Sequence, residues 1–304
     1  MNIVCTLDNG YLKPCGVMLT SLCENNKDEK LHIFVVSQDL TDQSKDVLRG
    51  IVEKQYHQAL SFINAADVKA MQRCDVSEEN GHISKAAFLR LFTASILPQN
   101  IDKVIYLDCD LIVRRSLVDL WNTDLTNLAL GAVEDESSTE FIQKGLCEHL
   151  KYDRKYNYFN SGVLLINLDY WRKTNAEDKF IKYLEEYNYQ LFQNDQDVLN
   201  GVLHAEKVLL PFTYNMTDNF YRKERQIRKE TWEELDSILP TAHIVHFTRS
   251  KKPWLKSCSH PMQRDFFKYV DLSPWKNERP KMNFYEKLYR EVRRALKYRK
   301  ISDQ

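Results

Sequence analysis

The chain has 304 residues, of which 43% are hydrophobic and 12% aromatic, so it is long enough for one large domain or two modest ones with a packed core. Its formal net charge is zero, which argues against a surface coated with basic charge, and we expect no nucleic-acid partner. The charge is unevenly distributed along the chain. Residues 276–304 carry ten Lys or Arg and four Asp or Glu, so this segment is basic and the rest of the chain is acidic by the same amount.

Strand and helix patterns alternate along the first hundred residues. The predicted strands are 2–7, 31–37, 59–63 and 104–107. The predicted helices are 11–24, 41–55 and 84–97. This alternation is typical of a parallel sheet with crossover helices.

The second half of the chain continues the α/β pattern. Further strands are predicted at 128–133, 162–168 and 242–247, and helices at 169–187 and 195–203. The sequence has no internal repeat and no long linker, so we expect one α/β domain over residues 1–273 and a basic appendage over 274–304.

The cysteines and the N-terminus indicate the compartment. Seven cysteines at irregular spacing, with no C-x-x-C, predict reduced thiols rather than disulfides or a zinc site. The chain begins directly with a strand pattern, which predicts no signal peptide, and no apolar stretch approaches the ~20 residues of a spanning helix. We therefore expect a cytoplasmic protein.

An acidic pair follows one of the predicted strands. Asp108-Cys109-Asp110 comes directly after the apolar run 103–107. Alternate residues of an extended chain point the same way, so Asp108 and Asp110 can converge on a divalent metal, whereas Cys109 points into the sheet. An ordinary acidic turn is the alternative interpretation of the pair.

Other polar clusters also fall at the edges of predicted elements. They are Asp8-Asn9-Gly10, Asn160-Ser161-Gly162 and residues 194–197. Asp195 could equally be the N-cap of the helix that follows it.

Histidines on a late strand add a further candidate ligand. His243 and His246 have opposite parity, so only one of them can face a pocket, either as a core residue or as a metal ligand beside two carboxylates. Lys251 and Lys252 follow the strand and favour a diphosphate nearby.

Taken together and in this order, six motifs resemble those of the retaining glycosyltransferases of family 8. They are Asp8 with Tyr11, residues 84–98 with their central Arg90, residues 106–110, 159–167 and 194–200, and His246-Phe247 with Lys252-Pro253-Trp254. The resemblance covers about residues 1–256. It implies a GT-A fold, a Rossmann-like open mixed sheet flanked by helices, together with a UDP-sugar donor and Mn²⁺, with Mg²⁺ as the alternative ion.

The resemblance also implies a role for each matching residue. The implied metal ligands are Asp108, Asp110 and His246. Asp8 and Tyr11 would bind the uracil ring, and Lys252 the diphosphate. The residues implied to surround the donor sugar are Arg90, Asp135, Asn160, Asp195 and Gln196. Of these, Asp135, Asp195 and Gln196 are the implied catalytic residues, with Gln196 nearest the anomeric carbon.

Two positions depart from the family pattern. Gly10 stands where relatives often carry Asn, and Arg249 stands where a Gly often lets the backbone approach the phosphates. Arg249 could contact a phosphate itself or point outward. Neither change removes an implied metal ligand.

The expected activity is transfer of galactose or glucose from UDP to a glycan acceptor, either oligosaccharide or lipid-linked, in lipopolysaccharide core or a surface polysaccharide. A nucleotidyltransferase is a weaker alternative, because Asp8-Asn9-Gly10 is not a Gly-rich basic phosphate loop. A catalytically silent nucleotide- or glycan-binding module is the other alternative.

The C-terminal appendage contains a predicted helix from about 283 to 300. Phe284, Leu288, Val292 and Leu296 form an apolar stripe, and basic residues cover much of the remainder. Such a helix is typical of one that binds an anionic membrane surface, here the inner face of the plasma membrane. Docking on its own domain, or a solvated cationic end, is the alternative.

Overall fold

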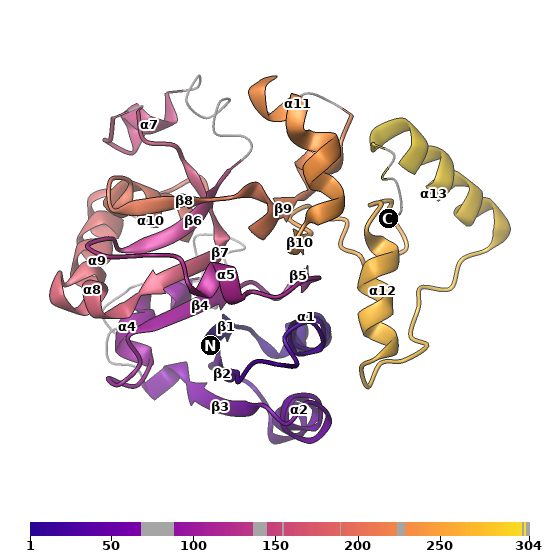
Figure 1. The fold of residues 1–304 in the computed structure, drawn as a ribbon, viewed down its shortest axis with the longest axis horizontal. Helices are drawn as coiled ribbons and strands as arrows, with labels where there is room; N and C mark the ends of the chain where they lie inside the picture. The colour runs from indigo at the N-terminus through magenta and orange to yellow at the C-terminus, as the bar shows by residue number, and fades with distance from the viewer. Residues whose placement is uncertain are drawn as a thin grey trace.

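A computed structural model of the chain describes residues 1–67, 88–135, 145–153, 155–188, 190–223, 229–299 and 301. A seven-stranded sheet in the order β3-β2-β1-β4-β7-β6-β8 forms the centre of the molecule, and a small sheet in the order β5-β10-β9 lies beside it (Figure 1). Helices cover both faces of the large sheet, which confirms the predicted open α/β architecture.

The strands follow the predicted apolar runs closely, and three short ones were not predicted. They are β1 (Asn2–Thr6), β2 (His32–Ser37), β3 (Ala59–Asn64), β4 (Lys103–Leu107), β5 (Leu111–Val113), β6 (Leu130–Glu134), β7 (Phe159–Asn167), β8 (Lys207–Leu210), β9 (Met216–Thr217) and β10 (Ile244–His246). Strands β1 to β4 are parallel, as the crossover pattern predicts. Strand β7 runs antiparallel to both of its neighbours, β4 and β6, so the sheet is mixed.

The helices flank this sheet or extend from its C-terminal side. They are α1 (Leu12–Glu24), α2 (Asp42–Arg49), α4 (Thr93–Ile96), α5 (Val118–Trp121), α7 (Leu146–His149), α8 (Leu168–Lys173), α9 (Ala176–Glu186), α10 (Asp195–Leu203), α11 (Lys229–Ile238), α12 (Gln263–Asp271) and α13 (Phe284–Lys297). Among the described residues, none of these helices combines the length and apolar character needed to span a membrane.

Two long predicted helices are wrong in part. The described portion of 84–97 is a 3₁₀ turn (Leu89–Phe92) followed by the single turn of α4, and 84–87 lie outside the described residues. The predicted helix 169–187 is broken between α8 and α9, where Asn175 adopts a left-handed conformation with φ of 51°. Asn tolerates that conformation better than most residues because its short side chain can hydrogen-bond locally.

Local capping explains two helix starts that the sequence predicted well. The Thr41 hydroxyl accepts a hydrogen bond from the backbone N–H of Ser44 at the start of α2. Asn283 and Glu286 form a reciprocal capping box at the start of α13. Both boundaries lie within a residue or two of their predicted positions.

Alternation along the strands divides the core into two layers. On one face of the sheet, residues such as Ile3 and Ile105 pack against α1 and α2. On the other face, residues such as Val4 and Tyr106 pack against α4, α8, α9 and α10. The central strands β1, β4, β6 and β7 are buried on both sides, which is typical of a parallel-type sheet and accounts for their continuous apolar runs.

One edge of the large sheet collects the predicted polar clusters. The parallel strands β1 and β4 end there, and β7 begins there because it runs in the opposite direction. The backbone N–H of Asp108 donates to the carbonyl of Gly162 at 2.9 Å, and the N–H of Phe247 donates to the carbonyl of Asp110 at 3.0 Å. The ends of β4, β7 and β10 are thereby held together.

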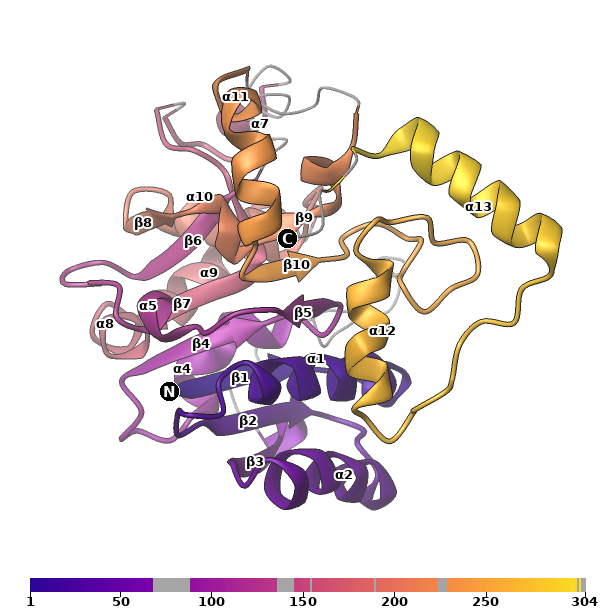
Figure 2. The same ribbon diagram turned by 45° about the vertical axis from the view of Figure 1, so that its right-hand side comes forward.

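The segment after α12 returns to the body of the molecule. The Trp275 side chain packs so closely over Gly16 of α1 that a Cβ atom at position 16 would lie 2.4 Å from its ring. Beyond this contact the chain extends to α13, which projects from the body in Figure 2. The proposed boundary between 273 and 274 stays a prediction.

The Trp275 contact predicts a specific loss of stability. Gly16→Ala should lower the free energy of unfolding by about 1–3 kcal/mol, because the methyl group overpacks a filled interface. Gly50→Ala is the matched control, since Gly50 is helical and nothing lies near its missing Cβ; it should be neutral or gain about 0.5–1 kcal/mol. Urea unfolding of both variants measures the difference, and equal midpoints would contradict this account of the Trp275 packing.

Candidate active site

The predicted site residues, apart from Asp8 and Tyr11, lie in one connected network of hydrogen bonds and ion pairs at the sheet edge. Three of them, Asp108, Asp110 and His246, place a ligand atom each within 4.8 Å of the others. The His246 Nε2 atom lies 3.0 Å from Asp110 Oδ1 and 3.7 Å from Asp108 Oδ2. Two carboxylates and one imidazole are a donor set that suits Mn²⁺ or Mg²⁺, so the residues present fit a divalent metal.

A neighbouring amide orients the His246 ring. The amide nitrogen of Asn215 donates to Asn160 Oδ1 at 2.8 Å, so the Asn215 oxygen faces His246 Nδ1 at 3.0 Å. His246 therefore donates its Nδ1–H to Asn215 and presents Nε2 to the two carboxylates. A hydrogen bond on the non-ligating nitrogen is the usual way in which proteins fix a ligating histidine.

Burial and charge act in opposite directions on these ligands. Burial disfavours the Asp110 carboxylate, but His246 and Lys252 outweigh burial and hold its pKa below the usual range. Burial likewise disfavours the His246 imidazolium, but Asp110 and Asp108 outweigh it and raise the pKa of His246. The cluster therefore holds negative charge at the sheet edge that cations must balance.

Arg90 is the central cation of the site. Its guanidinium is 7% exposed and forms ion pairs with Asp108 at 2.8 Å and Asp195 at 3.0 Å. It also donates to the backbone carbonyl of Ser161 at 2.8 Å and lies over the ring of Tyr106. Burial disfavours the charged guanidinium, but the carboxylates of Asp108 and Asp195 outweigh the effect of burial and raise the pKa of Arg90.

Gln196 is held at both ends of its amide. Its oxygen accepts from the backbone N–H of Ser161 at 3.0 Å, and its nitrogen donates to Asp135 Oδ2 at 3.2 Å. The same Asp135 oxygen accepts from Asn160 at 3.3 Å. These three predicted sugar-binding residues therefore lie side by side, with the orientation of Gln196 fixed.

A second group lies where β1 ends. The Asp8 carboxylate accepts from the backbone N–H of Tyr11 at 3.1 Å, and the Tyr11 ring, 37% exposed, meets Trp254 edge-on. Lys252 donates to Asp110 at 2.6 Å and to the backbone carbonyl of Phe247. Lys252 therefore lies beside the acidic cluster, as the resemblance implies.

Gly162 leaves room for the cluster. A Cβ atom at this position would lie 2.2 Å from His246 Cε1 and 2.7 Å from Asp108 Oδ2. Any larger residue would displace the side chains of His246 and Asp108, because these are the atoms nearest to the added Cβ. The glycine of the Asn160-Ser161-Gly162 motif is thus explained by the close approach of β7 to the acidic cluster.

The structure corrects two sequence interpretations and shows the role of a further residue in the cluster 194–197. Asp195 is not a helix cap, because it is the first residue of α10 and its carboxylate binds Arg90 and Ser161. Asp197 supports the fold, since it accepts hydrogen bonds from the Tyr158 hydroxyl and the Gln193 backbone. A surface acidic turn is likewise wrong for 108–110, since Asp108 and Asp110 are mostly buried in the network.

The structure also shows where Arg249 and His243 point. The Arg249 guanidinium is exposed and donates to the Asn219 side chain at 2.6 Å. His243 packs on Tyr214 away from the acidic cluster, so His246 is the histidine that faces it, as the parity argument requires. Cys109 points into the core beside Cys5 and Cys15, which agrees with a packing role.

Sequence reasoning missed two members of the network. Asn215 lies between a 3₁₀ turn and β9, in a segment with no strong periodicity, and it matches none of the six motifs. The motif Asn160-Ser161-Gly162 predicts no role for Ser161 itself. In the structure its backbone and hydroxyl connect Arg90, Asp195 and Gln196. Its position between two predicted site residues was the available signal.

Comparison with known proteins agrees with this site and fold. A family model described as glycosyl transferase family 8 matches residues 2–258. The match covers most of the chain, which is therefore a glycosyltransferase by family. The protein belongs to glycosyl transferase family 8.

The chain is similar to several curated relatives. It is 27% identical over 284 residues to general stress protein A of Bacillus subtilis, a match that covers 90% of this chain and 94% of the relative. It is 24% identical over 283 residues to lipopolysaccharide 1,2-glucosyltransferase of Escherichia coli K12, covering 92% of this chain and 80% of the relative. Relatives of this chain thus include lipopolysaccharide glycosyltransferases.

Solved structures define the fold class. The galactosyltransferase LgtC, in complex with donor and acceptor sugar analogues, superposes with a TM-score of 0.77 at 24% identity, covering 90% of this chain and 96% of LgtC. The glycosyltransferase GlyE of Streptococcus pneumoniae gives a TM-score of 0.65 at 21% identity, covering 99% of this chain and 66% of GlyE. The fold is GT-A, as the sequence motifs imply.

The buried Asp195 carboxyl predicts a pH-dependent contribution to stability. Burial raises its pKa from 3.8 to about 6, despite the opposing Arg90. A folded-state pKa above the unfolded value stabilises the fold below the unfolded pKa, and this contribution is lost as the pH rises through about 6. Asp195→Asn removes it, so the stability of wild type relative to the variant should fall by about 2 kcal/mol between pH 4 and pH 7, at about 1.4 kcal/mol per pKa unit.

Chemical unfolding across this pH range measures the effect. Asp102→Asn, a change at an exposed carboxylate before β4, is the control and should give a constant difference from wild type. If the Asp195→Asn difference were also constant with pH, the assigned environment of Asp195 would be wrong.

Proposed function

We propose that the protein is a retaining hexosyltransferase that moves galactose or glucose from a UDP-sugar to a glycan acceptor in lipopolysaccharide core or a surface polysaccharide. The observation that carries the proposal is the convergence of Asp108, Asp110 and His246 at the sheet edge, with Lys252 beside them. Ligands of open α/β sheets bind at this edge. The lipopolysaccharide glucosyltransferase among the relatives supports the acceptor class.

The metal assignment follows from the donor set. Asp108, Asp110 and His246 would hold Mn²⁺, or Mg²⁺ as the alternative, and the bound ion would offset charge on the diphosphate of the departing UDP. Lys252 adds a fixed positive charge on the same side of the site. The Asp8 carboxylate and the Tyr11 ring, where β1 ends, would bind the uracil by a hydrogen bond and by stacking.

The sugar end of the donor would lie against the amide and carboxylate cluster. Arg90, Asp195 and Asn160 would position the hexose, and Asp135 would hold the amide of Gln196 toward it. An amide is a poor nucleophile, so Gln196 is better suited to stabilise positive charge near the anomeric carbon than to attack it. This favours displacement on the same face as the leaving group, through an oxocarbenium-like transition state.

Neither rival is favoured by the site. A nucleotidyltransferase would be expected to carry a Gly-rich basic loop after β1, where this chain has Asp8-Asn9-Gly10. A silent binding module would not need the orientation of His246 by Asn215 or of Gln196 by Asp135. Titration with UDP in the presence and absence of Mn²⁺, followed by a donor-hydrolysis assay, separates the three functions, and a panel of UDP-sugars identifies the hexose.

A single carboxylate tests the metal assignment. Asp110→Ala should abolish Mn²⁺-dependent release of UDP from UDP-galactose or UDP-glucose, because the variant keeps only two of the three ligands. Asp102→Ala, on the exposed residue at the opposite end of the same strand, is the control and should retain full activity. Full turnover by Asp110→Ala would refute the assignment.

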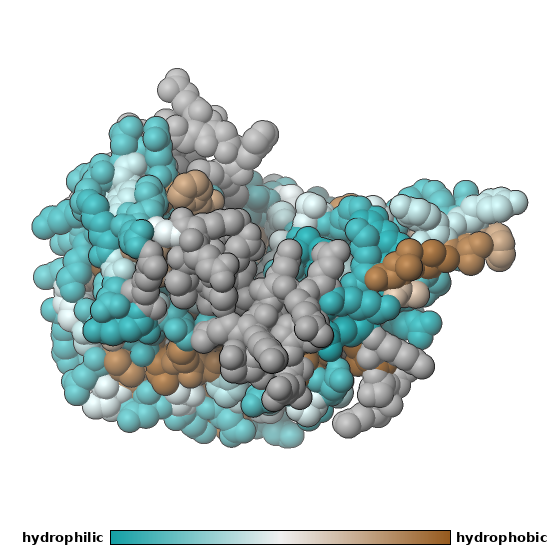
Figure 3. All heavy atoms as spheres, turned by 90° about the horizontal axis from the view of Figure 1, so that it is seen from above, coloured by the Kyte–Doolittle hydropathy of each residue, from teal (hydrophilic) through white to brown (hydrophobic). Residues whose placement is uncertain are grey.

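The orientation of α13 supports the proposed membrane partner. Its apolar residues face solvent, with Phe284 73%, Leu288 53% and Leu296 72% exposed. They form the hydrophobic stripe on the projecting helix in Figure 3. The contacts of α13 to the body come from polar residues such as Arg290 and Arg294, so the helix touches its own domain while the apolar stripe stays uncovered. A helix that presents an apolar stripe and carries cations is suited to an anionic membrane surface.

The stripe can be tested without removing the helix. Leu288→Asp with Leu296→Asp should lower binding to anionic vesicles at least about tenfold, because each leucine contributes roughly 1.5–3 kcal/mol when fully buried. Leu255→Asp with Leu272→Asp changes two leucines exposed elsewhere to a similar degree and should bind like wild type. Deleting 276–304 should abolish co-sedimentation while sparing UDP-sugar hydrolysis, and unchanged co-sedimentation of either α13 variant would rule out this partner.

A further inference from the structure

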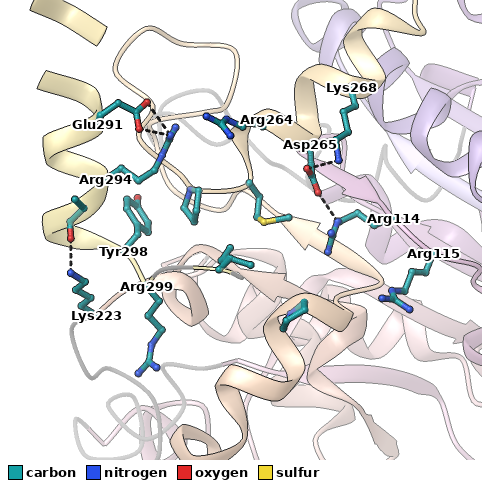
Figure 4. Close-up of a pocket in the computed structure, with 15 residues that line it drawn as sticks. Arg114, Arg115, Lys223, Arg264, Asp265, Lys268, Glu291, Arg294, Tyr298 and Arg299 are labelled. Atoms are coloured by element: carbon teal, nitrogen blue, oxygen red, sulfur yellow. Dashed lines mark hydrogen bonds and ion pairs between the residues drawn. The ribbon is translucent and has the colours of Figure 1, made fainter. Parts of the chain in front are cut away.

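A cavity of about 620 Å³ lies between α12, α13 and the end of β5, away from the acidic cluster. Figure 4 shows charged side chains from these separate elements around one space. The lining residues are Arg114, Arg115, Lys223, Pro240, Pro261, Met262, Arg264, Asp265, Lys268, Glu291, Arg294, Ala295, Tyr298, Arg299 and Ile301.

The lining has a large excess of positive charge. Seven of these residues are Lys or Arg, and only two are acidic. Both acids are already paired, Asp265 with Arg114 at 2.8 Å and Glu291 with Arg294 at 2.8 Å. Within the part of the chain that the structure describes, Arg115 and Arg264 form no ion pair. The cavity therefore contains two cations, Arg115 and Arg264, that no residue in the described part of the chain neutralises.

The paired cations of the lining include mostly buried ones, whereas the unpaired Arg115 and Arg264 are exposed. The side chains of Arg294 and Arg299 are only 18% and 15% exposed. Burial lowers the pKa of Arg294, Glu291 opposes this effect, and the neighbouring Arg290 and Arg264 lower the pKa further. A bound anion would relieve the repulsion among these guanidinium groups.

The catalytic centre does not use this charge. Asp110 precedes β5 and Arg114 follows it, so the three residues of the strand separate the two sites by ~10 Å at 3.3 Å per residue. None of the predicted catalytic, donor-binding or metal-binding residues lines the cavity. A role in donor binding therefore does not account for it.

Helix α13 connects the cavity to the apolar stripe. The face that carries Glu291, Arg294 and Ala295 lines the cavity, whereas Leu288 and Leu296 face solvent. An interfacial helix buries its apolar face ~5–10 Å into the boundary between headgroups and acyl chains. At about 100° per residue the face that lines the cavity adjoins the apolar stripe, so on a helix ~10–12 Å across it lies at about the level of the lipid headgroups.

We propose that this cationic cavity binds the phosphate group of an anionic lipid headgroup, an inference that rests on the membrane partner proposed above. Clustered arginines suit a phosphate group, because each guanidinium offers paired N–H donors that match phosphate oxygens. Among the described residues, Arg264, beside Arg294, and Arg115, beside His243, are the unpaired cations of the lining, and both add to the positive potential that the phosphate would meet. The apolar stripe would hold the helix in the interface, and the cavity would select the phosphate-bearing lipid.

The test separates the cavity from the stripe and from catalysis. Dihexanoyl phosphatidic acid, below its micelle concentration and without metal, should bind wild type in calorimetric titration. Arg115→Gln with Arg264→Gln should weaken this binding at least about tenfold, because the two unpaired positive charges of the lining are lost. Lys54→Gln with Lys179→Gln removes two exposed charges elsewhere and should bind like wild type. Equal binding by the two double variants would overturn the proposal.

Further arms identify the source of the phosphate. Wild type should prefer phosphatidylcholine vesicles that contain phosphatidic acid over those that do not, and the Arg115→Gln, Arg264→Gln variant should lose this preference. If inorganic phosphate bound as tightly as the lipid and vesicles showed no preference, the lipid assignment would be overturned in favour of a soluble phosphate.

The failures of the two proposals can be told apart. Short-chain lipid binding that persists while vesicle binding is absent would refute the membrane partner and support the cavity. UDP binding with Mn²⁺ should be the same in wild type and in both double variants, so a failure of the proposed catalytic function would appear only in that titration.

Discussion

The active-site edge depends on one buried cation. Arg90 joins the carboxylate at the end of β4 to the carboxylate at the start of α10, through Asp108 and Asp195. Its third contact, to the backbone of Ser161, connects the start of β7. An uncompensated guanidinium in this position would cost several kcal/mol, so the two carboxylates and the arginine are stable only together. Segments far apart in the chain are thereby held in register at the site.

The network continues from this ion pair to the imidazole. Ser161 donates to Gln196, Gln196 donates to Asp135, and Asn160 donates to the same carboxylate. Asn215 then connects Asn160 to His246, and His246 contacts the acidic pair. Each member fixes the hydrogen-bonding state of the next, so the site is organised before any ligand arrives. Preorganised dipoles of this kind need no reorientation when charge develops on a reacting group. The same network that stabilises the sheet edge therefore prepares it for chemistry.

Much of this arrangement could be predicted from the sequence, because strand parity and the parallel crossover rule bring the ends of β1 and β4 to one edge. The parity of Asp108 and Asp110 and the choice of His246 over His243 follow from the same rule. The role of Asn215 could not be predicted, because it lies in irregular backbone and its partner is 31 residues away. The assignment of Asp195 as a cap failed because a buried arginine, not the helix N-terminus, satisfies its carboxylate.

Helix α13 shows a different limit of sequence reasoning. Its amphipathic pattern predicts that two faces exist, but the pattern does not say which face meets the protein. In water, docking the apolar face would bury the most apolar surface, yet the body of this protein presents Gln263 and the backbone of Ser259 to α13 and receives Arg290 and Arg294 there. Because the docking surface is polar, the apolar stripe of α13 stays uncovered and is available to contact another apolar phase. The surface chemistry of α12 and of the segment before it, rather than α13 itself, therefore determines which face of α13 remains available.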